Sequence, residues 1–406
     1  MNDQTVSRPA PRAGSRALFK GLEVDVYANH ASISPPSLPV RQAVADSLAG
    51  YARRGMAWYR NEVQRRRRVR AALTGLIGAE PGTVGLTGNT SLGVLAVALN
   101  LDWRRGDRVL LLDGEFPANV IPWQQAARRH NLALSWLDSD EFRISRARAL
   151  SRLEDELKQG VRLLAVSAVQ FSTGQRMPLE QIGKLCHQYD AELFVDAIQA
   201  VGIVPLNVQA LGIDYLASGS HKWLMAPEGA GLLYVAPQRA DALQPNLAGW
   251  LSQEDPFAFL ERAPGELRYD RPFIGGGKML ELGTPATLAI AGLEASLDLI
   301  VQLGVEAILD HVHAWHDRLE PGLAERGFAS ARMKDAGGRS GILSVRPDNP
   351  ALAPAWAAAL AERGIACASP DGWLRLAPHW PNSLAEPARI LAAVDEILAG
   401  GGPGQG

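Results

Sequence analysis

An acid and a lysine stand at the ends of two successive hydrophobic runs. Asp196 closes the run Phe194-Val-Asp, and Lys222 follows the run from Tyr215 to Ser220. Because the carboxyl ends of parallel strands meet at one edge of a sheet, both side chains are expected at that edge. A carboxylate that keeps a pyridine nitrogen protonated, beside an amine that condenses with an aldehyde, would suit an aromatic aldehyde cofactor. Alone, Asp196 could equally be a helix cap and Lys222 a solvated surface lysine, so it is their joint placement that favours chemistry.

A third candidate lies where an earlier strand turns into a helix. The run Leu86-Thr-Gly-Asn-Thr-Ser-Leu-Gly93 turns through Gly88 into a helix expected to begin near Ser91. Free backbone N–H groups and the helix dipole favour a phosphate there, and the hydroxyls of Thr90 and Ser91 add donors. An ordinary helix cap is the alternative. After the next strand, Phe116 in Glu115-Phe-Pro-Ala-Asn119 stands where its ring could stack on a flat ligand, although an isolated phenylalanine is more often a core residue.

Alternating strands and helices must position these residues. Short β-branched and aliphatic runs are typical of buried strands, and the amphipathic segments between them are typical of helices. The alternation predicts an α/β fold with a mostly parallel seven-stranded sheet, covered on both faces. The expected strands are 84–87, 109–112, 133–137, 163–169, 193–196, 215–218 and 231–235, and the helices among them are 91–100, 119–130, 145–158 and 179–189.

The pattern changes in the second half of the chain. Residues 244–283 are rich in Pro, Gly and charge, which predicts a linker, and helices predominate afterwards. We therefore expect a large domain and a smaller C-terminal α+β domain, with flexible segments at both ends. The later helices are expected at 285–303, 305–326, 353–363 and 386–398, and the domains at 21–270 and 271–399, with an N-terminal arm at 1–20 and a tail at 400–406.

Composition limits the class of partner. The chain has 406 residues, of which 47% are hydrophobic, so it can bury a large core. Its 41 Lys+Arg and 43 Asp+Glu leave a formal net charge of -2, which gives no long-range field that favours DNA or an acidic membrane. Two cysteines cannot form a disulfide framework, and the first 20 residues have no apolar stretch typical of a signal sequence. A small-molecule partner and a cytoplasmic location are expected.

Five motifs together resemble class V aminotransferases, which are pyridoxal-phosphate (PLP) enzymes of fold type I. This family includes cysteine desulfurases, kynureninases and isopenicillin-epimerase-like enzymes. The resemblance runs in order from about Tyr27 to Leu398, and it is more specific for fold and cofactor than for the reaction. The motifs are Asp196-Ala-Ile-Gln199, Ser220-His-Lys-Trp-Leu, Glu228-Gly-Ala-Gly-Leu-Leu-Tyr-Val235, Glu281-Leu-Gly-Thr-Pro285 and Leu374-Arg-Leu-Ala-Pro-His379.

The resemblance implies a role for each cofactor-contacting residue. Lys222 would hold PLP as a Schiff base and move the Cα proton of the substrate. Asp196 would pair with the pyridinium nitrogen, and Gln199 would reach the phenolic oxygen or support the ring. Phe116 would stack on the ring, where desulfurases have a histidine. The residues implied at the phosphate are Thr90, Ser91, Ser220 and His221, with Thr284 supplied by a second subunit, so a homodimer with shared sites is also implied.

The substrate side is implied in the same way. Arg375 would bind the α-carboxylate of an amino acid by the bidentate geometry that a guanidinium offers. Asn29 and Ala31, in Tyr27-Ala-Asn-His-Ala, match the segment that lines the substrate pocket. The walls of the side-chain pocket stay open, with Trp58, Tyr59, Trp223, Trp250 and His379 as candidates.

The chain departs from the family pattern in two places. The usual Asn is absent from Ser167-Ala-Val-Gln-Phe-Ser-Thr-Gly174, where Gln170 is the candidate substitute. A cysteine desulfurase also needs a cysteine on a mobile loop to attack the substrate sulfur. Cys367 instead lies in an expected strand close ahead of Arg375, without the Gly- and His-containing loop, and Cys186 is expected to be a core thiol.

Three other features have simple interpretations. The arginine run at 65–68, with Arg70, lies on a helical pattern and is expected to be a solvated helix face rather than a nucleic-acid site. His311, His313 and His316 contain no i, i+4 pair, so no metal site is expected. The run 275–278 lacks the spacing of a phosphate-binding loop, and no dinucleotide fingerprint follows an early strand. It is expected to be a flexible loop near the site that reaches toward a neighbouring subunit.

The expected chemistry begins with an α-amino acid whose carboxylate Arg375 holds and whose Cα proton Lys222 removes. Transamination, loss of a β-substituent and epimerisation all use the same lysine, so the fate of the substrate stays open. Aminotransferase and carbon–sulfur lyase chemistry are favoured equally, with amino-acid epimerase and cysteine desulfurase as alternatives. A non-catalytic PLP-binding protein is disfavoured because it has no use for a carboxylate clamp.

Overall fold

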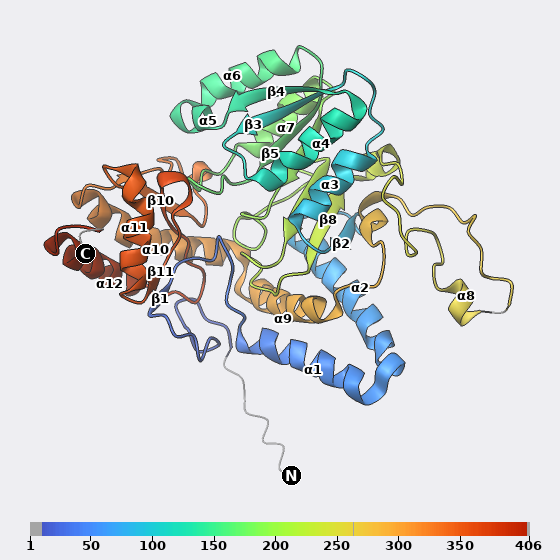
Figure 1. Cartoon of the computed structure of the whole chain (residues 1–406), viewed down its shortest axis with the longest axis horizontal. Helices are drawn as coiled ribbons and strands as arrows, with labels where there is room; N and C mark the ends of the chain where they lie inside the picture. The colour runs from blue at the N-terminus through green and yellow to red at the C-terminus, as the bar shows by residue number, and fades with distance from the viewer. Residues whose placement is uncertain (1–9, 263, 404–406) are drawn as a thin grey trace, which may run out of the picture.

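A seven-stranded sheet forms the centre of the computed structural model, which describes residues 10–262 and 264–403 (Figure 1). The strand order is β2-β8-β7-β6-β5-β3-β4, and only β8 runs antiparallel to its neighbours. All seven expected strands are present, and the prediction of a mostly parallel sheet is confirmed. Their bounds are β2 Val84–Thr87, β3 Arg108–Asp113, β4 Ala133–Asp138, β5 Val161–Ser167, β6 Glu192–Asp196, β7 Tyr215–Gly219 and β8 Gly231–Val235.

Helices cover both faces of this sheet. On one face Val97 and Trp123, from α3 and α4, pack in one hydrophobic cluster, and on the other Leu73, Leu153 and Ile182 belong to a second. Both faces are therefore dry, which explains why the strands are nearly continuous apolar runs. The bounds are α1 Leu38–Arg54, α2 Tyr59–Leu76, α3 Thr90–Asn100, α4 Ile121–His130, α5 Asp140–Ile144, α6 Arg146–Leu157, α7 Leu179–Gln188 and α8 Ala258–Glu261.

The C-terminal part has its own core. A three-stranded sheet in the order β12-β10-β9 packs with α10, α11 and α12, and the short strand β1 near the N-terminus pairs in parallel with β11. This pairing brings the segment after β1 close to the carboxyl ends of the central strands. The bounds are β1 Val26–Tyr27, α9 Thr287–Leu303, α10 Val305–Glu325, β9 Ala329–Ser330, β10 Leu343–Arg346, α11 Ala353–Ala361, β11 Ile365–Ala366, β12 Leu374–Leu376 and α12 Glu386–Ala399.

The expected domain boundary at residue 271 stays a prediction, although the packing bears on it. Helix α9 packs against α1 and α2, whereas α10, beyond Gly304, packs against α12. The expected arm at 1–20 lies outside the described residues up to residue 9, and beyond it Leu18 and Phe19 are buried. The last three residues of the expected tail also lie outside. In the described residues no single helix is long and apolar enough to cross a membrane, and the bent pair α9–α10 passes that test only by length and composition.

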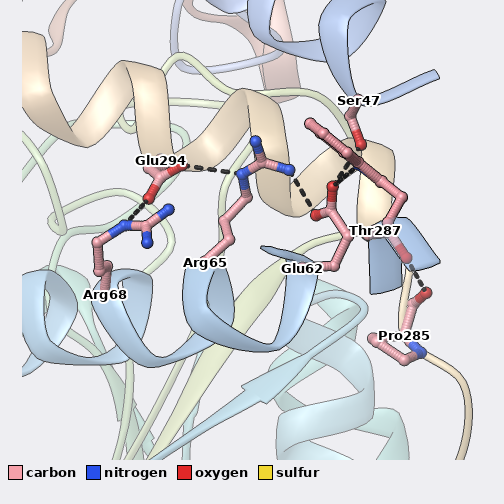
Figure 2. Close-up of polar contacts among 8 residues, drawn as sticks. Ser47, Glu62, Arg65, Arg68, Pro285, Thr287 and Glu294 are labelled. Atoms are coloured by element: carbon pink, nitrogen blue, oxygen red, sulfur yellow. Dashed lines mark hydrogen bonds and ion pairs between the residues drawn. The ribbon is translucent and has the colours of Figure 1, made fainter. Parts of the chain in front are cut away.

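The arginine-rich face of α2 is an ion-pair network rather than a fully solvated surface (Figure 2). Arg65 donates to Glu62 on its own helix and to Glu294 on α9, and Arg68 also donates to Glu294. Further along α2, Arg70 pairs with both carboxylate oxygens of Glu281. The pairs with Glu281 and Glu294 hold the linker and α9 against α2, because these two acids come from those segments.

The run at 275–278 is not a flexible loop. It enters a short 3-10 helix, Gly276–Leu280, that lies against β2. A Cβ atom built on Gly85 of β2 would stand 1.9 Å from the carbonyl oxygen of Gly277, so glycine is needed for this close backbone approach. Across residues 10–262 and 264–403, no group of three His, Cys, Asp or Glu side chains could hold a metal ion.

Candidate active site

A cavity of about 450 Å³ opens beyond the carboxyl ends of β6 and β7. This is the position at which ligands bind in parallel α/β sheets. Nine of the twelve site residues that the sequence predicts line it, and they come from segments far apart in the chain. The nine are Ala31, Thr90, Ser91, Phe116, Asp196, Gln199, His221, Lys222 and Arg375.

Asp196 and Lys222 have unusual titration behaviour because the site is buried. Asp196 ends β6, and burial raises its pKa to about 7, while the backbone N–H of Ile198 lowers it and the charge of Glu115 raises it further. Burial lowers the pKa of Lys222 to about 8, with the charge of Arg375 adding to this and that of Asp196 opposing it. About a tenth of Lys222 is therefore neutral at pH 7, far more than for an ordinary lysine, and a nucleophile and a base need the neutral amine.

A tight turn after β7 fixes the lysine. Met225 adopts a left-handed conformation with φ of 50° and donates from its backbone N–H to Lys222 O at 3.0 Å. Ser34 Oγ donates to the same carbonyl oxygen at 2.6 Å. The next residue back, His221, lines the cavity, and burial together with the charge of Lys222 lowers its pKa. His221 is therefore neutral at physiological pH and offers a hydrogen bond rather than a charge.

The N-terminus of α3 lies at the cavity. The helix begins at Thr90, and its N-cap is Asn89, whose side chain accepts from Leu92 N at 2.9 Å. Thr90 Oγ1 accepts from Gly219 N at 2.8 Å, which joins this helix to the end of β7. Thr90, Ser91 and Asn89 all line the cavity. This position suits an anion, because Thr90 and Ser91 line the cavity and belong to the first turn, whose backbone N–H groups have no partner within the helix.

Two aromatic rings form one wall. Phe116, half exposed, stands 5.5 Å from Lys222 Nζ, measured to its ring centre. Phe171 packs edge-on against it, with ring centres 5.3 Å apart. Gln199 also lines the cavity. Its Nε2 donates to Ala31 O at 3.0 Å, and its Oε1 accepts from Trp223 Nε1 at 2.7 Å. Gln199 thus holds the segment that contains Ala31 in place, and the second N–H of its amide remains available to donate to a ligand.

Arg375 is buried, and two neutral acceptors hold it. Nη1 donates to Phe171 O and Nη2 to Ser32 Oγ, both at 2.7 Å, and Nε has no protein partner. Burial lowers its pKa to about 10, so the guanidinium stays charged at neutral pH. A buried cation without a carboxylate partner is costly, and an incoming carboxylate would compensate that cost.

Three predicted residues do not line the cavity. Ser220 is buried, and its hydroxyl donates to Pro227 O at 2.8 Å. Asn29 makes a backbone bridge to Ala377, while its Oδ1 is buried without a partner. Thr284 is exposed in the linker just before α9, where Thr287 donates to Pro285 O (Figure 2). The expected delivery of Thr284 by a second subunit stays a prediction. The candidate walls Trp58, Tyr59, Trp223, Trp250 and His379 also lie off the lining.

Sequence reasoning missed four residues. Asn89, Ser32 and Phe171 line the cavity, and Glu115 is buried behind it. Gln170, the candidate substitute for the family's Asn, donates instead to Glu115 Oε1 at 3.0 Å, and its neighbour Phe171 faces the cavity. One signal was available: Glu115 is an acid directly beside Phe116 at a strand end.

Neither cysteine is placed to be a nucleophile. Cys367 follows β11 and is not part of the lining, whereas its neighbour Ala368 is. Burial raises the pKa of Cys367 to about 12, with Arg375 opposing the effect, so its thiol stays protonated. Cys186 is buried in α7, where desolvation also raises its pKa to about 12, as expected for a core thiol.

The residues present fit PLP. Asp196 Oδ2 is buried without a partner while Oδ1 accepts from Ile198 N, so one carboxylate oxygen is left for a protonated ring nitrogen. The N-terminus of α3 suits a phosphate, Phe116 offers a ring face, and Lys222 is partly neutral. These features match a flat, anionic pyridine aldehyde at both ends and along its face.

Comparison with known proteins agrees with this fit. The aminotransferase class V family model matches residues 39–372. An uncharacterized aminotransferase, YcbU of Bacillus subtilis, is 28% identical over 384 residues, covering 95% of this chain and 96% of that protein. The apo structure of a cysteine desulfurase from Thermococcus onnurineus has a TM-score of 0.81 at 26% identity, covering 93% of this chain and 95% of that one.

A second structural relative is C-DES, for which two structures are informative. A variant with glycine covalently linked to its PLP cofactor has a TM-score of 0.82 at 26% identity, covering 94% of this chain and 98% of that one. The complex of this cystine C–S lyase with its product, cysteine persulfide, has a TM-score of 0.80 at 25% identity, covering 91% and 96%.

Proposed function

The chain belongs to the class V aminotransferase family and is a PLP-dependent enzyme that acts on an α-amino acid, and we propose that it is a carbon–sulfur lyase. In this reaction the Cα proton and a sulfur group on Cβ are both lost. The observation that carries the proposal is the chemistry of the cavity, which has an acid, a base and a carboxylate clamp but no cysteine. The fold, the family and the cofactor expected from the sequence are confirmed.

The residues divide the work between holding the substrate and moving its proton. When bound, PLP supplies an aldehyde carbon for the amine and a ring that withdraws electrons from Cα. The free N–H groups of Arg375 bind the α-carboxylate, and the amine of Lys222, with its pKa near 8, accepts the Cα proton. The ionised carboxylate of Asp196, which has one oxygen without a protein partner, would keep the ring nitrogen protonated through its negative charge.

A lyase fits the cavity better than a desulfurase does. A desulfurase transfers sulfur to its own thiolate, whereas Cys367 is off the lining and its pKa is raised to about 12. β-Elimination needs no such nucleophile, because the sulfur group leaves with the bonding electrons and a proton. The likeness to the cystine C–S lyase C-DES, which covers 91% of this chain, supports the same choice.

The lining also limits the substrate side chain. Beyond Arg375, Lys222 and Asp196, the cavity walls carry no charge, because His221 is neutral and the other lining side chains are apolar or bear only a hydroxyl or an amide. An acidic or basic substrate side chain would lose its hydration without gaining a counter-charge. We therefore propose an amino acid with an uncharged sulfur-containing side chain, such as cystine or an S-substituted cysteine.

Transamination is the second candidate, and the likeness to an uncharacterized aminotransferase over 95% of the chain favours it. Purified holoenzyme should be incubated with cystine, S-methylcysteine, alanine and glutamate. A lyase converts cystine and water into pyruvate, ammonia and cysteine persulfide, all of which can be assayed. Keto acid formed without ammonia, together with the amine form of the cofactor, would instead establish transamination and overturn the proposal.

We also propose a homodimer located in the cytoplasm. The region of α8 projects from the body of the molecule (Figure 1), and its neighbours Leu267 and Tyr269 are exposed, the latter by 83%. Such apolar side chains favour burial against another surface. Thr284 is exposed too, which leaves it free to reach a second subunit's phosphate site. Sedimentation of the holoenzyme would test this: a monomer at micromolar concentration would overturn it.

A further inference from the structure

One buried carboxylate at the cavity has no role in the mechanism above. We propose that Glu115 is a positioning residue for the cofactor pocket, which clamps the segments bearing Phe116 and Phe171 together and holds a negative charge behind Asp196. The inference rests on PLP occupying this cavity, and it is independent of whether elimination or transamination follows.

Glu115 gathers hydrogen bonds from two separate strand-end segments. Its Oε1 accepts from Ser167 N at 2.7 Å and from Gln170 Nε2 at 3.0 Å. Its Oε2 accepts from the hydroxyl of Ser167 and from Asn119 Nδ2, the latter at 3.2 Å. Glu115 follows β3 and Ser167 ends β5, so one side chain connects the two neighbouring strands at the edge where the cavity lies.

The two connected segments carry the aromatic wall. Phe116 is the next residue after Glu115, and Phe171 is the next after Gln170. Their rings are in edge-on contact, and the carbonyl of Phe171 also accepts from Arg375. Loss of the Glu115 carboxylate would therefore release the ring-stacking side chain and, through Phe171, the carboxylate clamp.

A second route connects Glu115 to the strand that bears Asp196. Asn119, which donates to Glu115, accepts from Trp123 Nε1 at 3.2 Å. Trp123 is buried and packs edge-on against Phe194, with ring centres 5.1 Å apart. Phe194 lies two residues before Asp196 on β6, so these contacts lead from Glu115 to the strand that bears Asp196.

Burial raises the pKa of Glu115 above its usual value, and its four hydrogen bonds oppose this rise because each of them stabilises the ionised carboxylate. No salt bridge to Glu115 occurs in the part of the chain described here, so its ionised form has no local counter-charge. The titratable group that faces it is Asp196, whose pKa the charge of Glu115 raises, and Lys222 faces Asp196 from β7's end. A second anion behind Asp196 stabilises a protonated ring nitrogen in front of it.

A matched control is available in the same sheet. Glu192 is also fully buried, but it stands at the opposite end of β6, four residues and about 13 Å from Asp196. Arg162 and Arg239 pair with it. Replacing Glu192 therefore reports what the loss of a buried carboxylate does to the fold without touching the cavity.

The test compares Glu115→Gln, Glu115→Asp, Glu115→Ala and Glu192→Gln in the full chain. The apo proteins are titrated with PLP, and the absorbance of each holoenzyme is followed against pH. Glu115→Gln keeps the volume and one acceptor, so it removes the charge with little loss of shape. Circular dichroism on each protein establishes that it is folded.

We expect the pH midpoint of the cofactor absorbance to fall by about half a unit or more in Glu115→Gln, because a nearby anion favours the protonated cofactor. In Glu115→Asp, which keeps the carboxylate, this pH midpoint should stay nearer to the wild-type value. Glu115→Ala should weaken PLP binding by roughly tenfold, since it leaves buried donors without an acceptor. Glu192→Gln should lower the melting temperature but leave both cofactor readouts unchanged. A folded Glu115→Gln with the wild-type midpoint and affinity, or a Glu192→Gln that shifts both equally, would overturn the proposal.

Discussion

Arg375 donates from Nη2 to Ser32 Oγ at 2.7 Å, although the two residues are 343 positions apart in the chain. Ser32 follows β1, and β1 pairs with β11, the strand that precedes β12 and Arg375. With the second contact, from Nη1 to Phe171 O, the guanidinium plane is fixed by two segments that lie far from Arg375 in the sequence. Its Nε, buried without a partner, is left for a ligand. The carboxylate clamp is therefore assembled by tertiary packing and held in a set orientation before substrate binds.

Replacing Arg375 with lysine should raise the KM for an α-amino acid by roughly 10- to 100-fold, because an ammonium cannot contact a carboxylate through two parallel N–H groups. Steady-state kinetics on the holoenzyme would measure it. Ser32→Ala is the matched variant, since it removes only the group that orients the guanidinium, and its KM should rise several-fold. The corresponding amine without a carboxylate should react equally poorly with all three proteins. An unchanged KM in Arg375→Lys would contradict the assignment.

The sequence predicted that Asp196 and Lys222 lie together because both stand at strand ends, and both line the cavity. Asp196 and Lys222 end consecutive apolar runs, so the periodicity that predicts the strands also places the side chains. The hydrogen-bonding partners could not be obtained in this way. Glu115 and Ser167 are 52 positions apart and Ser32 is 343 from Arg375, and no local pattern encodes such pairs. Ser220 shows the converse: it belongs to the predicted motif, yet its hydroxyl is used by the turn itself.

The pH dependence of cofactor capture should report the lowered pKa of Lys222. With a pKa near 8, about a tenth of the amine is neutral at pH 7, against well under a thousandth for an ordinary lysine. The rate at which the apo protein binds PLP covalently, trapped with borohydride, should rise with pH and level off above about 8. Because the charge of Arg375 lowers this pKa, Arg375→Met should move the midpoint upward. A midpoint near that of free lysine would contradict the burial argument.

Cys367→Ala should leave the turnover of a sulfur-containing amino acid within about twofold of wild type. The thiol does not line the cavity, and its raised pKa of about 12 keeps it protonated. Sulfur release in the presence and absence of an external thiol should be measured for both proteins. A loss of more than tenfold, or a persulfide found on Cys367 by mass spectrometry, would favour the cysteine desulfurase alternative.

Asp196→Asn should stabilise the apo protein and weaken the holoenzyme. Burial raises the folded-state pKa of Asp196 to about 7, so between about pH 4 and 7 the folded state binds more protons than the unfolded one, and stability falls as pH rises. The unfavourable charge is fully present above pH 7, and the variant removes it. Urea denaturation of the apo protein at pH 8 should give a free energy of unfolding about 1 to 4 kcal/mol higher than wild type, with the difference shrinking toward pH 5.

The matched control for this change is Asp214→Asn. Asp214 is equally buried, but Arg239 Nε and Leu193 N both donate to it at 2.8 Å. Removing this paired buried carboxylate leaves Arg239 with only its longer contact to Glu192, so the variant should be destabilised at pH 8. With PLP bound, wild type should be more stable than Asp196→Asn. The unpartnered Oδ2 of Asp196 would then pair with a protonated ring nitrogen, and a neutral asparagine could not supply the same charge. If apo Asp196→Asn were no more stable than wild type at pH 8, the buried charge of Asp196 would not destabilise the apo protein, and the prediction would be wrong.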